Sequence, residues 1–297
     1  MKRHSAADWV MLLALTVMWG SSFLSTKVAL GSLPFDWVVS GRLLVATIIL
    51  VPVATLAVGR WPRGWRVWSF FVLMALTGNL LPFSLIAWGQ QSIDSGLAGI
   101  LMAVMPLATL SLAHFLVPGE QLTRFRVGGF LLGFVGVLVL LGPATALPDV
   151  GNEGNLLAML AVLVGAWCYA VSAILARLRP PSDAVSTAAA VTTIAALMSL
   201  VWVDGPDPAW LIDAPSATAA LLFLGVFSTA AAAVVYYRLI KSAGPSFVSQ
   251  LNFLIPLWAV GIGILFLGES PQPHHLHALA LILGGIALTQ FDRRRPR

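Results

Sequence analysis

Long apolar runs separated by short polar connections make up most of the chain. Each run is about as long as the roughly 20 residues that an α-helix needs to cross a hydrocarbon core, and the connections are rich in Gly, Pro and Asp. This alternation predicts an all-α polytopic membrane protein with ten transmembrane helices. The predicted spans are residues 8–32, 35–58, 66–90, 94–117, 123–142, 154–178, 183–203, 215–240, 245–267 and 273–291.

The composition supports a membrane location. At 59% hydrophobic and 10% charged over 297 residues, the chain carries more apolar mass than one soluble core of this size can bury. The short connections leave no room for a sizeable soluble domain. The first run is too long for a signal-peptide core and no small-residue cleavage site follows it, so we expect a mature spanning helix. A single cysteine, Cys168, excludes an intramolecular disulfide.

The positive charges indicate which side of the membrane each connection faces. Of the 17 Lys and Arg residues, only Lys27 and Arg42 lie more than one turn inside a predicted span. With ten helices threaded back and forth, all the others fall on the side that carries both termini. The positive-inside rule therefore predicts that both termini are cytoplasmic. We interpret the basic clusters, including Arg293, Arg294 and Arg295, as topology and contact with anionic lipid, and we expect no nucleic-acid partner.

Residues 95–120 and 245–269 share one design, an apolar run with Pro-Leu at its middle and Gly-Glu at its end. About half the chain separates the two copies, so we predict a first five-helix repeat at 1–145 and a second at 146–297. Because five is an odd number, the second repeat is inverted, an arrangement used by transporters with a site near mid-membrane. The strict matches are Leu101 with Leu251, Pro106 with Pro256, Leu107 with Leu257, and Gly119-Glu120 with Gly268-Glu269 after a one-residue slip.

Several motifs resemble a known family. They are Trp19-Gly20-Ser21-Ser22-Phe23 in the first predicted helix, the Pro-Leu helices that end in Gly-Glu, and the glycine-spaced helix after each. Together they resemble the drug/metabolite transporter superfamily in its ten-helix EamA-like branch, and within it the bacterial amino-acid exporters of the YddG type. The resemblance covers essentially the whole chain. It implies substrate export by alternating access around a central cavity.

Polar and aromatic side chains inside the first predicted helix are candidate substrate ligands. Trp19 and Ser22 share one face with Phe23 and Thr26 at helical spacing. Such a face suits a small polar metabolite, and it also suits close packing between helices. Lys27 costs roughly 2.5–3.5 kcal/mol at bilayer depth on insertion scales. It therefore either lines the pathway, where it attracts a carboxylate, or extends to the outer surface.

The second and third predicted helices add further candidates. Arg42 lies about two turns deep, where it either pairs structurally or contacts the substrate. Asn79 and Phe83 share one face of the third helix. A buried amide needs a hydrogen-bond partner in lipid, so Asn79 bonds either another helix or the substrate.

The repeat aligns position 102 with position 252, and both are expected near the centre. Met102 offers an adaptable surface to apolar groups, whereas Asn252 suits a polar head group, with Ser249 one turn earlier. The paired prolines Pro106 and Pro256 are assigned to the same site.

In the sixth predicted helix Trp167 and Tyr169 point apart, and Trp167 is preferred because it corresponds to Trp19. Tyr236 and Tyr237 lie near the cytoplasmic end of the eighth helix, where they are either ligands or members of the interfacial aromatic belt.

Glycines spaced along the fifth and tenth predicted helices permit close backbone approach, within the protein or between copies. They are Gly129, Gly133, Gly136, Gly284 and Gly285.

Motifs for catalysis, metals and cofactors are missing from the sequence. His274, His275 and His277 fall in a predicted outer loop without a nearby cysteine, so we interpret them as solvated and expect no metal site. No hydrolytic motif or phosphate-binding glycine loop occurs, and no Asp or Glu lies well inside a predicted helix. We therefore expect no catalytic residue, no cofactor and no proton exchange on a buried carboxylate.

These observations predict a multi-pass transporter of the bacterial inner membrane that exports small metabolites, foremost aromatic or other neutral amino acids, without an energy-coupling ion. Its expected partners are the small-molecule substrate and the lipid bilayer, and the protein is expected to be a monomer or weak homo-oligomer. The alternatives are a proton-coupled exporter of drugs or other metabolites, an intramembrane lipid-modifying enzyme, and a membrane structural or receptor subunit.

Overall fold

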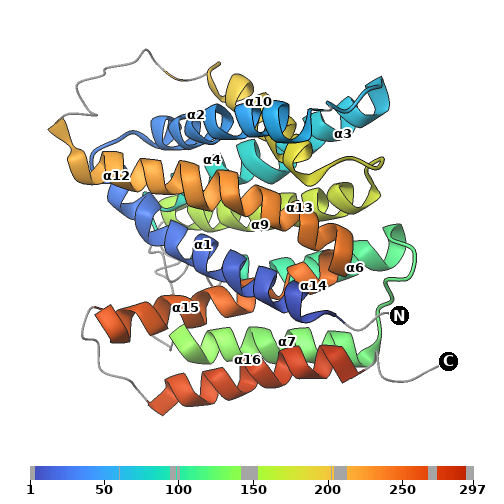
Figure 1. Ribbon diagram of the computed structural model, residues 1–297. Helices are drawn as coiled ribbons and strands as arrows, with labels where there is room; N and C mark the ends of the chain where they lie inside the picture. Colours follow the sequence, from blue (N-terminus) through green and yellow to red (C-terminus); the bar gives the residue numbers. More distant parts are fainter. Residues whose placement is uncertain are drawn as a thin grey trace.

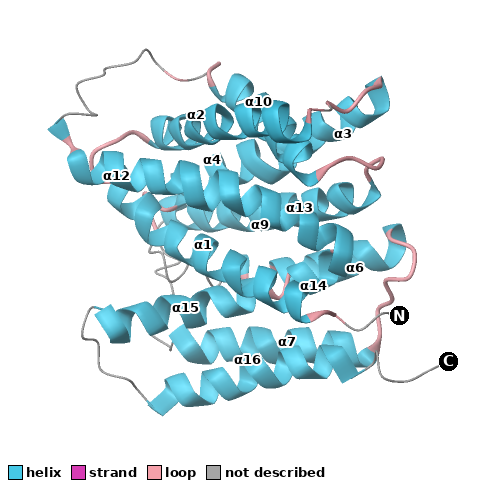
Figure 2. Cartoon of the chain, in the orientation of Figure 1, coloured by secondary structure: helices cyan, strands magenta, loops and turns pink. Residues whose placement is uncertain are grey.

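The computed structural model describes residues 4–59, 61–93, 98, 101–141, 153–201, 203, 213–266 and 273–291. Over these residues the chain is helical and contains no strand (Figure 2). The all-helical fold expected from the apolar runs is therefore confirmed.

The described helices form ten consecutive segments, several of which continue through a π-helical stretch. The first five are α1 (Ala6–Leu30); α2 (Phe35–Val53) with η1 (Ala54–Val58); α3 (Trp65–Ala75) with η2 (Leu76–Leu80) and α4 (Leu81–Gly89); α6 (Met105–Leu116); and α7 (Arg124–Leu141). The last five are α9 (Glu153–Leu178); α10 (Ala184–Ser199); α12 (Pro215–Phe223) with η3 (Leu224–Ala231) and α13 (Ala232–Ala243); α14 (Pro245–Val248) followed by α15 (Leu251–Phe266); and α16 (Pro273–Phe291).

Five of these segments are long and apolar enough to cross a membrane. Three further helices are apolar but shorter, at 10–17 described residues. The start of the predicted 94–117 helix lies largely outside the described residues. The five long segments are Ala6–Leu30, Phe35–Val58, Trp65–Gly89, Leu156–Leu178 and Pro215–Ala243.

Local chemistry sets several helix ends. Ser5 and Asp8 form a capping box, in which each side chain bonds the backbone N–H of the other residue at the start of α1. Asp183 accepts hydrogen bonds from the N–H groups of Val185 and Ser186 at the start of α10. Figure 1 shows that α1 begins and α16 ends at the same end of the bundle, which we call the terminal end.

Helix packing follows a twofold pattern. Helix α1 packs against α12, α13 and α15, and α9 packs against α4 and α6. Helix α2 packs against α10, and α7 lies along α16 (Figure 1). Segments one to five correspond to segments six to ten. If each segment is replaced by its counterpart, every contact named above becomes another contact of the same set; the α1–α15 contact, for example, becomes the α9–α6 contact. The packing therefore fits an architecture of two five-helix repeats.

The contact between α7 and α16 depends on glycine. A Cβ atom added to Gly129 would lie 2.5 Å from the carbonyl oxygen of Gly285, and one added to Gly285 would lie 2.7 Å from the backbone nitrogen of Gly133. Both separations are too short for a real Cβ atom, so only glycine allows the two backbones to meet. The close approach predicted from the glycine spacing is confirmed, and it occurs within the chain.

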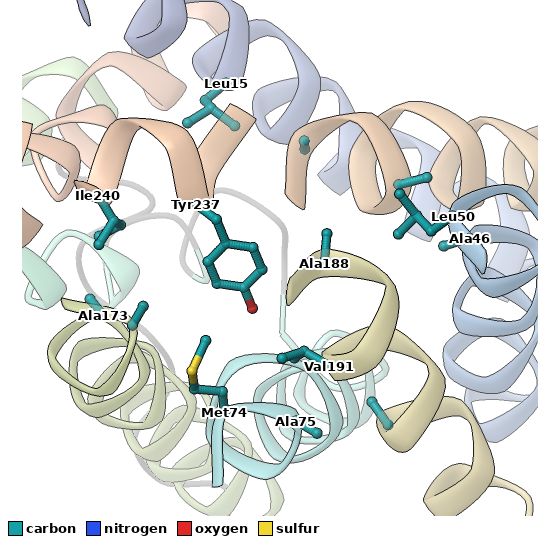
Figure 3. Close-up of a cluster of buried hydrophobic side chains, with 14 of the residues drawn as sticks. Leu15, Ala46, Leu50, Met74, Ala75, Ala173, Ala188, Val191, Tyr237 and Ile240 are labelled. Carbon is teal, nitrogen blue, oxygen red and sulfur yellow. The ribbon is translucent and has the colours of Figure 1, made fainter. Parts of the chain in front are cut away.

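The largest group of buried apolar side chains closes the terminal end of the bundle. It combines the first half of α1 with residues along α2, α3, α10 and α13, the end of α9, and α14 with the start of α15. In Figure 3 the ring of Tyr237 lies in the middle of this group, among Met74, Ala188, Val191 and Ile240. This half of the bundle is consequently filled by side chains.

Candidate functional site

A cavity with a volume of about 130 Å³ lies in the middle of the bundle. Side chains from both halves of the chain line it, on α1, α2, η2, α4 and α6 from the first half and on α9, η3, α13, α14 and α15 from the second. A single water molecule needs roughly 10–15 Å³ of such space. The cavity therefore has room for a cluster of waters or a small metabolite.

Six of the residues expected to bind substrate line this cavity: Trp19, Ser22, Asn79, Phe83, Met102 and Asn252. The side-chain amide of Asn252 donates to the carbonyl of Ser249 over 3.1 Å, and the same nitrogen lies 3.1 Å from the Met105 sulfur. Asn252 therefore joins the start of α15 to α6 beside the cavity.

The other expected residues lie elsewhere. Lys27 is exposed in the last turn of α1, and Trp167 is 47% exposed on the outer side of α9. Pro106 is buried in α6, and Ser249 is buried with its hydroxyl donating to the carbonyl of Ser246 over 3.1 Å. None of these four lines the cavity. Pro256 falls within α15, but its side chain is outside the described part of the structure.

Three tyrosines that were not selected from the sequence line the cavity. Tyr169 faces inward while Trp167 faces outward, because two positions in an α-helix differ by about 200°. Tyr236 and Tyr237 are not at the helix end, since the segment continues to Ala243, and Tyr237 is only 5% exposed. Placement of these two in an exposed aromatic belt is therefore wrong.

Four aromatic side chains at the cavity form two ring pairs, each between different helices. The ring centroids of Trp19 and Tyr236 are 5.6 Å apart, and those of Phe83 and Tyr169 are 6.4 Å apart in an edge-to-face arrangement. Both separations fall within the range of favourable aromatic contacts. The walls consequently offer apolar ring surface with polar atoms at only a few points.

The π-helical stretches determine which groups reach the cavity. η2 and η3 occupy the middle of the third and eighth segments, which are equivalent under exchange of the two halves. The indole nitrogen of Trp19 donates to the carbonyl of Ser228 in η3 over 3.0 Å, and the Ser228 hydroxyl donates to the carbonyl of Met18 over 2.8 Å. Such stretches are frequent at functional sites because they free backbone groups.

Gly78 in η2 allows the third segment to approach α9. A Cβ atom at Gly78 would collide with the hydroxyl of Ser172, and both residues line the cavity. Because Gly78 has no side chain, η2 and α9 lie close together here, and the Ser172 hydroxyl makes this part of the cavity wall polar.

Arg42 also lines the cavity, and its side chain is 7% exposed. Its Nε atom donates to the hydroxyl oxygen of Thr229 over 3.0 Å, and its guanidinium carbon lies 4.0 Å from the centroid of the Phe83 ring. The sequence identified Arg42 as a cation at bilayer depth, but left open whether it faced the pathway. Only the packing of α2 against η3 shows that it does.

An apolar helical bundle with a central polar and aromatic cavity is typical of multi-pass membrane transport proteins. Two segments, residues 8–142 and 153–291, each match the EamA-like transporter family. The chain belongs to this family and contains the EamA-like domain twice, which confirms the resemblance inferred from its motifs.

Known proteins show similarity over nearly the whole chain. A WAT1-related chloroplastic protein of Arabidopsis thaliana is 28% identical over 96% of this chain and 69% of that protein. A protein of Streptantibioticus cattleyicolor named probable terminal-alkyne amino-acid exporter is 27% identical over 98% of this chain and 96% of that protein. A solved crystal structure shares the fold with a TM-score of 0.78 at 21% identity, covering 98% of this chain and 99% of that chain.

Proposed function

We propose that the protein is a facilitative exporter of small metabolites, foremost aromatic or other neutral amino acids, and that it works by alternating access. The observation that carries this proposal is the central cavity, to which both halves of the chain contribute. Its ring surfaces suit an apolar body, and its amides and hydroxyls suit polar groups. The Streptantibioticus relative, named as an amino-acid exporter, supports amino acids as the substrate class.

The shape of the cavity supports alternating access. Its lining includes Thr26, Val38 and Gln90, which lie within about one turn of the helix ends remote from the terminal end. The terminal end is closed by the apolar group around Tyr237. In our proposal the inverted repeats are residues 1–145 and 146–297. Each of the groups that move against each other contains helices of both repeats, because α1 packs against α12, α13 and α15 whereas α9 packs against α4 and α6.

The proposed topology has ten spans in a bacterial inner membrane, with both termini in the cytoplasm. Arg63, Arg66, Arg124, Arg177 and Lys241 lie near helix ends that meet at the terminal end of the bundle. The positive-inside rule then assigns this end to the cytoplasm. The proposed assembly is a monomer or weak homo-oligomer.

The charges at the site support the proposal of facilitated transport over proton-coupled transport. Among the described residues that line the cavity there is no Asp or Glu, and a proton-coupled transporter needs a group of this kind in the membrane. The substrate gradient is therefore the proposed driving force.

Flux measurements with purified protein in liposomes test this function. Vesicles loaded with a panel of labelled amino acids should release at least one of them faster than protein-free vesicles, with a rate that saturates. Absence of flux for the whole panel would reject amino-acid transport. Chemical conversion of labelled phospholipid by the same preparation would instead support the lipid-modifying enzyme.

A further inference from the structure

Arg42 places a positive charge at the cavity with no negative side chain to balance it. It is the only charged residue among the described cavity-lining residues. The one ion pair between described side chains joins Arg126 to Glu120, at the connection between α6 and α7. Arg42 is seven positions beyond the first residue of α2, or about 10 Å along the helix. A cation at such depth needs water, a counter-ion or a ligand.

Neighbouring residues hold the guanidinium in one orientation. The Thr229 hydroxyl donates its proton to the carbonyl of Leu224 over 2.8 Å, which leaves its oxygen free to accept from Arg42 Nε. The flat face of the guanidinium lies over the Phe83 ring. Neither terminal nitrogen, Nη1 or Nη2, has a hydrogen-bond partner within the described part of the chain.

Two free terminal nitrogens in one plane match the two oxygens of a carboxylate. Arginine forms paired, parallel hydrogen bonds with such a group, and these are stronger than bonds between neutral partners. A single cation balances a single negative charge, so a monocarboxylate fits better than a doubly charged phosphate. The surrounding rings of Trp19, Tyr169 and Tyr236 suit an apolar or aromatic body.

The cavity offers much less to an ammonium group. Among the described lining residues the acceptors are neutral, such as the amide oxygens of Asn79 and Asn252. An ammonium group would gain little binding free energy here, because no carboxylate balances its charge and the like-charged guanidinium of Arg42 lies in the same cavity. The carboxylate of an amino acid should thus contribute far more to binding than its amine.

We propose that Arg42 binds the substrate carboxylate, and that the cavity recognises small monocarboxylates with an apolar or aromatic body whether or not they carry an α-ammonium group. This inference rests on the proposed transport function and specifies its substrate class. Thr229 and Phe83 act as positioning residues, because they orient the guanidinium.

Four ligands of similar shape test the inference on the wild-type protein. Phenylalanine carries both charged groups, 3-phenylpropionate only the carboxylate, phenylalaninamide only the amine, and 3-phenylpropanamide neither. Binding is measured as the concentration-dependent rise in the melting temperature of purified protein in detergent. We expect the two carboxylates to stabilise the protein and the two amides to bind on the order of tenfold to a hundredfold more weakly, as the loss of charge-assisted hydrogen bonds implies.

Substitutions then assign the preference to Arg42. Arg42→Gln should abolish the discrimination between 3-phenylpropionate and 3-phenylpropanamide, and Arg42→Lys should retain part of it, since lysine keeps the charge but not the paired geometry. Thr229→Val should weaken carboxylate binding while leaving the arginine in place. Arg66→Gln is the matched control. Arg66 is exposed and also lies over an aromatic ring, 5.6 Å from the Trp65 centroid, so carboxylate binding should be unchanged.

Two results would overturn the inference: equal binding of carboxylates and amides by the wild type, or a carboxylate preference that survives in Arg42→Gln. The wild-type comparison needs no variant, so a misfolded mutant does not weaken it. Failure of the proposed transport function can be distinguished from failure of the proposed carboxylate site. Carboxylate-specific stabilisation without flux in liposomes would reject transport and keep the site, whereas equal flux of acids and amides would reject only the carboxylate site.

Discussion

Trp19 and Ser228 illustrate how single side chains hold the site together. The indole of Trp19 bonds the Ser228 carbonyl, while the Ser228 hydroxyl bonds the carbonyl of Met18. The two bonds run in opposite directions between α1 and η3, so neither helix can rotate without breaking one. The Trp19 ring also packs against the ring of Tyr236, with the centroids 5.6 Å apart. Trp19 therefore both lines the cavity and fixes the orientation of α1 relative to η3.

Replacing Trp19 with Phe keeps an aromatic ring and removes the indole donor. We expect a loss of about 0.5–1.5 kcal/mol in stability, together with slower substrate flux, because a buried carbonyl loses its partner. Melting temperature and liposome flux measure the two effects. Trp68→Phe is the control, since Trp68 donates to the carbonyl of Pro62 over 3.1 Å at the surface. Equal flux defects in both variants would contradict a specific role for Trp19.

Helix contacts in this protein rely on small residues more than on large apolar ones. Lipid tails compete with apolar side chains for contact, so helices in membranes associate best where their backbones can approach closely. Gly129, Gly136 and Gly285 allow this between α7 and α16. The π-helical stretches have the complementary effect, because they turn polar groups of the third and eighth segments toward the cavity.

Two adjacent glycines of α16 should differ sharply in their tolerance of alanine. Gly285→Ala places a methyl group 2.5 Å from the backbone oxygen of Gly129 and should cost about 1–3 kcal/mol, as in other overpacked sites. Gly284→Ala is nearly neutral, since its methyl group lies 3.7 Å from the Leu132 side chain. Thermal unfolding in detergent measures the difference. Similar melting temperatures for the two variants would disprove the glycine contact.

Deleting one residue from a π-helical stretch tests its role in directing side chains. Removal of Thr77 from η2 should rotate α4 by about 100° relative to α3, which moves Phe83 away from the cavity and lowers flux at least tenfold. Removal of Leu56 from η1 is the control, because Leu56 is 85% exposed and this helix ends at Gly59. Expression level and flux are compared for both deletions. Full activity after removal of Thr77 would refute the proposed role.

Two groups of charged residues in this protein have different expected effects, one on membrane topology and the other on transport. Basic residues gather near the helix ends at the terminal end of the bundle, whereas the cavity contains Arg42 and no carboxylate among its described lining residues. By the positive-inside rule, the first feature supports the proposed orientation with both termini in the cytoplasm. In the proposed function, the second selects the substrate and sets which ion gradients can act on transport.

A pH gradient across the liposome membrane should leave the flux of a neutral amino acid unchanged. Arginine keeps its proton at all physiological pH values, and no described cavity residue is a carboxylate that would exchange one. The measurement compares initial rates at equal pH with rates under an imposed gradient, using a zwitterion whose charge stays constant. Accumulation against its own gradient when only the pH differs would establish proton coupling and exclude facilitation.

The apolar runs were sufficient to predict an all-helical membrane protein, because in lipid every backbone group must bond within its own segment. The family was inferred from motifs such as Trp19-Gly20-Ser21-Ser22-Phe23. Trp19 and Asn79, selected from helical spacing, and Asn252, selected from the repeat, also line the cavity. The sequence could not show that Tyr169 rather than Trp167 faces inward, or that Arg42 rather than Lys27 lines the cavity. Those orientations depend on which helices pack together and on where π-helical stretches shift the register, and both arise from contacts between segments far apart in the chain.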